Sequence, residues 1–297
     1  MARSQAQPQA RLQSWRDMPA FRISQRTGFS LPGELLLVAI TLLALFFLVY
    51  PTAWVILASF KTPGTMFSAT EIEFSIVNYL TLFQTGYARN IFNSLYLCLA
   101  AVLISTVVSV AAAYTFSRLR FRWKRHIFGS VLLGQCFPWI ILVTPLFILF
   151  ARAGLLNNHL SMLFVYTAIT IPFSVYLLVG YLESVPRQLD EAAIIDGCTR
   201  FQVIWKIVFP IMLPGIVATA TYAFMLCWTE YLFALAFLTK TDLKTMPLGL
   251  YAFFGEDTAE WGNIMAASAL TTFPTLLLFL PLQTKLASGL AAGSVKQ

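Results

Sequence analysis

Long apolar runs without charge are the feature that most constrains how this chain can fold. Crossing a bilayer takes about 20 consecutive apolar residues, and a chain with several such runs cannot cover them with polar surface in water. Hydrophobic residues make up 58% of the 297 residues and charged residues 11%, where soluble proteins average about 45–50% and about 25%. The sequence therefore predicts an all-α integral membrane protein with six transmembrane helices, at 35–60, 91–116, 127–150, 160–182, 211–238 and 264–282.

Lysine and arginine are distributed unevenly between the loops, which predicts the orientation of the chain. Six spans place both termini on one side, together with the loops 118–125 and 183–210. That side carries fifteen of the 20 Lys and Arg residues, and cytoplasmic loops are the ones enriched in these residues. Both termini are therefore predicted to be cytoplasmic. The net charge of +7 is interpreted as a topology signal, so nucleic-acid binding is not expected.

The spans are predicted to form one membrane domain between two tails. Residues 1–33 are expected to be a polar cytoplasmic tail, residues 34–287 the six-helix domain and residues 288–297 a second cytoplasmic tail. The apolar run at 35–60 is longer than the core of a signal peptide, which has 7–15 residues. The four cysteines contain no CxxC spacing, so neither a disulfide framework nor a zinc site is indicated.

The loop 183–210 carries the most informative pattern in the sequence. Pro186 suits the first turn of a helix, and Gly197 is placed to end that helix. Thr199 followed three residues later by Gln202 has the spacing of a capping box, so a second helix is expected to begin there. The loop is predicted to be a helix–glycine–helix hairpin at the membrane surface, although a plain interfacial connector fits the spacing equally well.

The same loop resembles the cytoplasmic signature of permeases from binding-protein-dependent ABC importers. That signature reads Glu-Ala-Ala, three residues, Gly, nine residues, Ile, one residue, Leu-Pro. In this sequence it is Glu191-Ala192-Ala193, Gly197, Ile207 and Phe209-Pro210, with Phe209 as the one departure. Other segments are similar to the carbohydrate branch of the family, the maltose-permease type and its second permease subunit: 93–125, 154–158, 228–235, 245–250 and 289–297. The resemblance covers roughly residues 33–297.

The resemblance implies a type I ABC importer permease fold in the bacterial cytoplasmic (inner) membrane. In such importers the hairpin docks on an ATPase subunit dimer, a homologous second permease completes the path, and an extracytoplasmic solute-binding protein delivers a sugar-like solute. This chain contains no GxxxxGK[ST] phosphate loop. We therefore expect it to be no enzyme and to bind no cofactor, with ATP and Mg²⁺ held by the partner ATPase. The residues implied in ATPase coupling are Asp190, Glu191, Ala192, Ala193, Asp196, Gly197, Arg200 and Pro210.

Glu230 is the one carboxylate inside a predicted span, about 12 Å from the end of that span at a rise of 1.5 Å per residue. A charged group inside a bilayer is costly unless it is paired or faces water. Two hypotheses follow: Glu230 accepts hydrogen bonds from a polar solute, or it makes a structural hydrogen bond or an ion pair with the second permease. The other candidates for the substrate path are Trp228, Thr229, Tyr231, Gln135 and Tyr176; relatives often have Asn where this chain has Thr229.

Two other classes of membrane protein were weighed against the importer permease. A secondary transporter driven by an ion gradient would use carboxylates, histidines or basic residues inside the membrane, and only Glu230 is available. An integral-membrane enzyme would need a nucleophile–base pair or a metal cluster at one depth, and no such constellation is visible. Neither class predicts the signature between Glu191 and Pro210.

Overall fold

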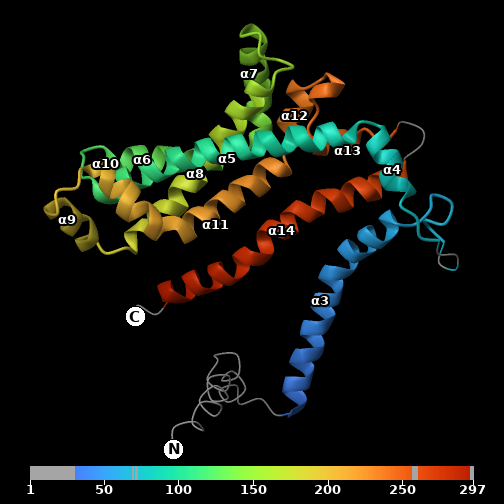
Figure 1. The fold of residues 1–297 in the computed structure, drawn as a ribbon, viewed down its shortest axis with the longest axis horizontal. Helices are drawn as coiled ribbons and strands as arrows, with labels where there is room; N and C mark the ends of the chain where they lie inside the picture. Colours follow the sequence, from blue (N-terminus) through green and yellow to red (C-terminus); the bar gives the residue numbers. More distant parts are fainter. Residues whose placement is uncertain (1–30, 69, 71–72, 256–259, 295–297) are drawn as a thin grey trace, which may run out of the picture. The chain divides into compact units, whose positions relative to one another are not determined.

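The computed structural model describes residues 31–68, 70, 73–255 and 260–294, so residues 1–30 of the predicted tail 1–33 lie outside them, and residues 31–33 are helical. Apart from turns and an isolated bridge between Lys61 and Phe74, the described chain is helical, which confirms the all-α fold class. It divides into two compact units, residues 1–54 and 55–297. The elements (Figure 1) are α3 (Leu31–Ser59), α4 (Val77–Gln84), α5 (Tyr87–Arg118), α6 (Lys124–Leu133), η1 (Gly134–Cys136), α7 (Trp139–Arg152), α8 (His159–Glu183), α9 (Gln188–Ile195), α10 (Arg200–Gln202), η2 (Val203–Val208), α11 (Phe209–Trp228), α12 (Leu232–Phe237), η3 (Thr241–Leu243), α13 (Met246–Tyr251) and α14 (Trp261–Ser294).

The described part of the first unit is a single stretch of apolar helix. It belongs to α3 and covers most of the predicted span 35–60. All side chains from Leu35 to Tyr50 are exposed within the chain, on every face of the helix. A helix that is apolar all round is stable against lipid or against another chain rather than in water.

Three long helices of the second unit, α5, α8 and α11, pack along one another (Figure 1). They confirm helices at the predicted spans 91–116 and 160–182 and over most of 211–238. The helices α8 and α11 approach closely where Gly215 meets Tyr181. A Cβ atom at Gly215 would lie 2.8 Å from the Tyr181 ring, so the missing side chain permits this contact.

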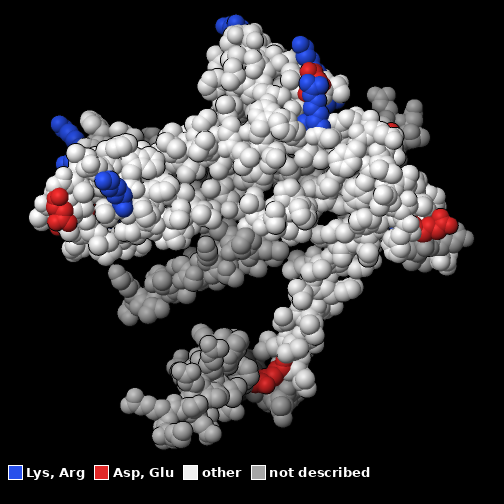
Figure 2. Space-filling model, viewed as in Figure 1, with Lys and Arg blue, Asp and Glu red and all other residues white. Residues whose placement is uncertain are grey.

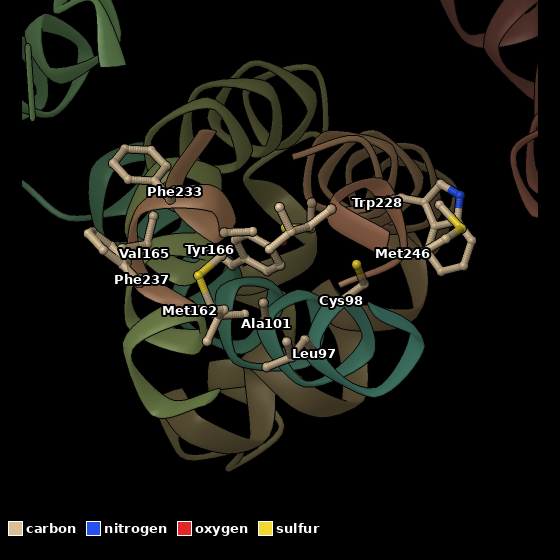
Figure 3. Packing of buried hydrophobic residues seen from close by; sticks show 14 of the residues in the cluster. Leu97, Cys98, Ala101, Met162, Val165, Tyr166, Trp228, Phe233, Phe237 and Met246 are labelled. Carbon is tan, nitrogen blue, oxygen red and sulfur yellow. The ribbon is translucent and has the colours of Figure 1, made fainter. Parts of the chain in front are cut away.

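Two apolar clusters lie along these helices. The first joins α5, α8, α11, α12 and α13 around Tyr166 and Trp228, and Figure 3 shows the Tyr166 ring between residues from α5 and α12. The second lies at the other end of α5 and joins α5, α8 and α11 to α9, through residues such as Val110, Ala193 and Val203. Burial of these side chains therefore fixes α9 against the end of the helix bundle.

The N-terminal end of α5 is fastened to the loop 239–246 by polar side chains. The amide of Asn93 donates to the carbonyls of Asp242 and Lys244, each at 3.0 Å. The hydroxyl of Ser94 accepts from the backbone N–H of Met246 at 2.7 Å. Both side chains are buried, so these bonds are protected from water.

The third predicted span, 127–150, is not one straight helix. It is a pair of helical segments, Lys124–Cys136 and Trp139–Arg152, bent by 98°. The break falls at Pro138, with Phe137 in an extended conformation. Proline disfavours helical backbone in the residue before it and lacks the N–H that would continue the helix.

The fifth predicted span, 211–238, is shorter than expected. Its helix, α11, ends at Trp228, and the chain turns at Thr229 to Tyr231 before the short α12 begins. Glu230 therefore lies in a break between helices and not on a continuous spanning helix, so the distance of about 12 Å, which assumed such a helix, does not apply.

The described residues contain four helices long and apolar enough to cross a membrane, or five if the bent pair counts as one span. The predicted sixth span, 264–282, lies within α14, so a helix is present there, but the predicted total of six spans is not confirmed. The same helix continues into the predicted tail at 288–297 as far as Ser294.

Charged side chains gather at the ends of the helices on the face seen in Figure 2. They lie around α9 and α10 and around the tips of α7 and α12, and the surface over α5, α8 and α11 between them is uncharged. A belt of uncharged surface between two charged ends is expected of a protein that crosses a bilayer.

Candidate functional site

The segment 186–202, called the knob below, forms the predicted helix–glycine–helix hairpin. Its first helix is α9, and Gly197 has φ of +87°, in the left-handed region that favours glycine. The N–H of Cys198 donates to the carbonyl of Ala193 at 2.9 Å and that of Gly197 to Ile194 at 3.0 Å, which closes the end of α9.

The second helix of the knob begins with the predicted capping box. The N–H of Thr199 donates to Oε1 of Gln202 at 2.8 Å, and the N–H of Gln202 donates to Oγ1 of Thr199 at 3.3 Å. From Arg200 the helix runs through the π-helical turn η2 into α11, so that Arg200–Trp228 forms one candidate membrane span. The knob is therefore joined without a break to a long helix of the bundle.

The residues predicted for coupling divide into an exposed set and a buried set. Ala193 and Asp190 are buried. Ala193 packs in the second apolar cluster, which anchors α9. The exposed set is Glu191, Ala192, Asp196, Gly197, Arg200 and Pro210.

Asp190 was predicted to offer a charge for docking, and the structure gives it an internal partner instead. Its Oδ2 lies 2.6 Å from Nε of Arg118, and the two side chains are 9% and 6% exposed. Arg118 is the last residue of α5, 72 positions earlier. A carboxylate buried against an arginine is not available to another chain, so only the exposed set remains for the predicted docking.

Apolar side chains accompany the exposed set at the tip of the knob. Ile195 is 85% exposed and Phe201 is 70% exposed, with Ile194 and Leu189 also exposed. These residues were not among the predicted ones, although Ile194 and Ile195 directly follow the Glu-Ala-Ala triplet. Apolar side chains rimmed by charges are a feature of protein interaction surfaces.

Glu230 lies in the interior and its carboxylate is occupied by the protein itself. The residue is 5% exposed. Its Oε1 accepts from the N–H of Phe233 at 2.7 Å, its Oε2 accepts from the N–H of Ala234 at 3.3 Å, and the hydroxyl of Tyr166 is a further partner. These are the otherwise unpaired donors at the start of α12. Of the two hypotheses for Glu230, the geometry favours a structural hydrogen bond.

The neighbours of Glu230 point in different directions. Trp228 is buried, stacks on Phe224 at 5.3 Å and donates from Nε1 to the carbonyl of Thr271 at 3.1 Å. Thr229 is exposed, and its hydroxyl donates to Met225 within the same helix. Tyr231 is half-buried against Tyr251, with ring centroids 5.5 Å apart. The run 228–231 therefore does not form one binding surface.

Two further candidates lie at exposed positions, and Tyr176 lies beside aromatic residues that the sequence did not single out. Gln135 is exposed and donates to the carbonyl of Ile169 at 3.3 Å. Tyr176 of α8 is exposed and contacts Phe173, whose ring lies 4.1 Å from that of Tyr222 of α11. We call Phe173, Tyr176 and Tyr222 the aromatic face. Tyr222 could have been found, because it precedes Thr229 by seven residues and so lies two turns away on the same side of α11.

Comparison with known proteins decides the family. Residues 105–291 match the model of the family described as "binding-protein-dependent transport system inner membrane component". This chain belongs to that family. It is thus a multi-pass permease of the inner membrane, the transport component of an ABC importer and not its ATPase.

Curated relatives of this permease are similar over most of their length. It is 33% identical over 257 residues to the diacetylchitobiose uptake system permease protein DasC of Streptomyces coelicolor, covering 84% of this chain and 92% of the relative. It is 33% identical over 271 residues to the trehalose/maltose transport system permease protein MalG of Thermococcus litoralis, covering 88% and 96%. The predicted resemblance to sugar importer permeases is confirmed.

Solved structures confirm the fold of the permease. A chain in the crystal structure of a bacterial ABC transporter that imports the acidic polysaccharide alginate matches with a TM-score of 0.71 at 20% identity, over 86% of this chain and 98% of that one. A second alginate transporter structure, in complex with a periplasmic protein carrying an alginate pentasaccharide, matches with a TM-score of 0.64 at 17% identity, over 84% and 91%. The secondary-transporter alternative finds no support among these matches.

Proposed function

We propose that this permease carries a sugar or a sugar-like solute into the cell together with a homologous second permease. The names of its relatives support a carbohydrate cargo: they include permeases for diacetylchitobiose, for trehalose or maltose, and for sulfoquinovosyl glycerol. Delivery of the solute by an extracytoplasmic binding protein follows from the family and is supported by the alginate transporter complex.

The knob is proposed to dock on an ATPase subunit of a dimer that holds ATP and Mg²⁺. The observation that carries this proposal is the exposed apolar tip at Ile195 and Phe201, rimmed by the charges of Glu191, Asp196 and Arg200. Left in water, such a surface would be unfavourable, and its mixed composition suits a protein partner better than lipid. The loop 183–210, which contains the knob, is predicted to lie on the same side of the membrane as both termini. Docking on a cytoplasmic ATPase therefore requires cytoplasmic termini, and the excess of Lys and Arg on that side supports this orientation.

The aromatic face is proposed to line the sugar path. Sugars present hydroxyl groups and apolar ring faces, and aromatic rings with polar edges match both. Tyr176 and Tyr222 offer exposed rings with hydroxyl groups, and Thr229 continues the same side of α11. The second permease would close this face from the opposite side, because the described chain leaves it open.

Affinity purification from the native membrane in mild detergent, followed by mass spectrometry and reconstitution, tests the assembly. We expect an ATPase with a phosphate loop, a second multi-span chain, and uptake of an oligosaccharide that requires ATP and the binding protein. Recovery of the chain by itself, with transport insensitive to ATP, would contradict the proposal.

The cargo contact is tested by Tyr222→Ala and Tyr176→Ala. Loss of a stacking ring is expected to raise the solute concentration needed for half-maximal uptake by about 2- to 12-fold, since aromatic contacts contribute about 0.5–1.5 kcal/mol. The control is Phe164→Ala, an exposed aromatic residue on a different face of α8. Equal effects of all three changes would argue against a specific sugar contact.

A further inference from the structure

Two arginines cross between the C-terminal end of α5 and the first part of the knob. From α5, Arg118 donates through Nε to Oδ2 of Asp190 at 2.6 Å and through a terminal nitrogen to the carbonyl of Val185 at 3.0 Å. In the other direction, Arg187 donates to the carbonyl of Ser117 at 2.8 Å. We call Arg118, Arg187 and Asp190 the arginine clamp. Each side of the contact donates to the other. The clamp therefore fixes the distance between α5 and the knob and the position of the knob along α5.

The Arg118–Asp190 pair of the clamp is buried, which distinguishes it from the other ion pair in the described chain. Arg89 and Asp242 are 3.9 Å apart with side chains 65% and 51% exposed, and such a surface pair contributes little. The side chains of Arg118 and Asp190 are 6% and 9% exposed. A buried pair gains little stability over an apolar pair, but it specifies one arrangement of the groups that it joins, and removing one partner is strongly unfavourable.

Among the described residues, Arg118 is the only side chain that forms an ion pair or a hydrogen bond with the carboxylate of Asp190. Its other carboxylate oxygen, Oδ1, is buried and has no hydrogen-bond partner there. Without Arg118 the whole carboxylate would be buried without compensation and would have to move toward water. Since Asp190 is in the first turn of α9, such a movement would displace the knob.

The helix held by the clamp has no residue type that commonly kinks a helix. α5 has 32 residues and contains neither Pro nor Gly, whereas α8 and α11 each contain a proline. It is about 48 Å long at 1.5 Å per residue. Ala193 of α9 belongs to the same apolar cluster as Val110 and Ala113 of α5, which supports the same junction.

We propose that Arg118 is a positioning residue that makes the knob and α5 move as one body. A displacement of the knob by the ATPase then passes into α5 through the clamp. The inference rests on the proposed docking of the knob, and it assigns Asp190 to transmission within the permease rather than to contact with the ATPase.

The test uses the complete reconstituted importer with Arg118→Leu, and with Arg122→Leu as the matched control. Arg122 is an exposed arginine in the same loop whose described contact is the ring of Trp123. We expect Arg118→Leu to lower solute uptake per ATP hydrolysed by at least about tenfold, since an uncompensated buried charge shifts a local equilibrium by more than that factor. ATP hydrolysis itself should continue, and Arg122→Leu should match the wild type.

A distance measurement separates positioning from a general loss of structure. Spin labels at Gln188→Cys in α9 and Ala111→Cys in α5, both exposed positions, report the junction directly after the native Cys136 and Cys198 are replaced. A narrow distance distribution is expected in the wild-type background and a broad one with Arg118→Leu. Wild-type uptake per ATP and a narrow distribution in Arg118→Leu would overturn the proposal.

The double change Arg118→Leu with Asp190→Leu guards against a variant that does not fold. An apolar pair in place of a buried ion pair is close to neutral for stability, so this variant should assemble. We expect its uptake per ATP to stay low, because the bonds from Arg118 to Asp190 and Val185 are gone, and wild-type coupling in it would refute the clamp. Failure of the proposed function would give a different result from failure of the clamp, because the wild-type complex itself would then lack ATP-dependent uptake.

Discussion

Glu230 provides the sharpest test of how this structure should be interpreted, because its two hypotheses predict different results for one substitution. In the structure both carboxylate oxygens accept backbone N–H groups at the start of α12, from Phe233 at 2.7 Å and Ala234 at 3.3 Å. The substitution Glu230→Ala removes both acceptors. Glu230→Gln leaves one oxygen, which can still accept from Phe233.

The expected magnitudes follow from the number of donors left without a partner. A buried donor that loses its acceptor costs about 1–3 kcal/mol. Glu230→Ala strands two backbone donors, so we expect these to cost about 2–6 kcal/mol in the free energy of unfolding. It also leaves the hydroxyl of Tyr166 without this acceptor. Glu230→Gln strands one, so its loss should be about 1–3 kcal/mol.

The assay is thermal unfolding of the purified importer complex, combined with uptake per folded complex. We expect the unfolding temperature to fall in the order wild type, Gln, Ala, and uptake per folded complex to change little. Glu183→Ala, at an exposed carboxylate on the last residue of α8, is the control and should unfold like the wild type. If Glu230→Ala unfolded like the wild type but lost uptake, the carboxylate would be acting on the solute and the structural interpretation would be wrong.

Four further changes test the knob and the loop 239–246. Gly197→Ala should lower thermal stability by about 1–2 kcal/mol, because its backbone is left-handed. Glu191→Lys should reduce the amount of ATPase that co-purifies, because it reverses a charge on the exposed side of α9. Thr199→Ala should lower the free energy of unfolding by about 1 kcal/mol through loss of the capping box, measurable by chemical denaturation. Asn93→Leu should increase amide hydrogen exchange in the loop 239–246, because two anchoring bonds are lost; unchanged exchange would show that other contacts hold this loop.

The knob could be predicted from the sequence because its determinants are local. A left-handed glycine and a capping box are both encoded within a few residues of the turn they form, so Gly197, Thr199 and Gln202 predicted the hairpin, although their spacing did not exclude a plain connector. The long spans could be predicted for a similar reason, since an uncharged run of about 20 residues indicates a crossing wherever it occurs.

The breaks within the predicted spans could not be read from composition. Pro138 bends its segment by 98°, while Pro172 and Pro214 lie inside continuous helices. A proline can be accommodated when neighbouring groups satisfy the freed carbonyl, so the outcome depends on tertiary packing. The position of Glu230 was missed for the same reason, because the apolar run hides the end of α11.

The assignment of Asp190 shows why a charge pattern in a loop does not reveal which charges are free. Glu191 and Asp190 are adjacent and both acidic, yet one is exposed and the other is buried against Arg118. Adjacent residues on a helix point about 100° apart, so only the packing of α9 on α5 decides between them. The partner is 72 positions away in the sequence, and no local signal connects the two.

The helix α5 contains no proline or glycine and is held by hydrogen bonds at both ends, which suits it to transmit movement in the transport cycle. Its C-terminal end is held to the knob by the arginine clamp, and its N-terminal end is held to the loop 239–246 by Asn93 and Ser94. The helices α8 and α11 that pack on it contain Pro172 and Pro214, where a helix bends more easily. A displacement of the knob should therefore be carried along α5 with little loss, while bending is absorbed in its neighbours. This arrangement links the surface proposed to bind the ATPase with the opposite end of the bundle through a single uninterrupted helix.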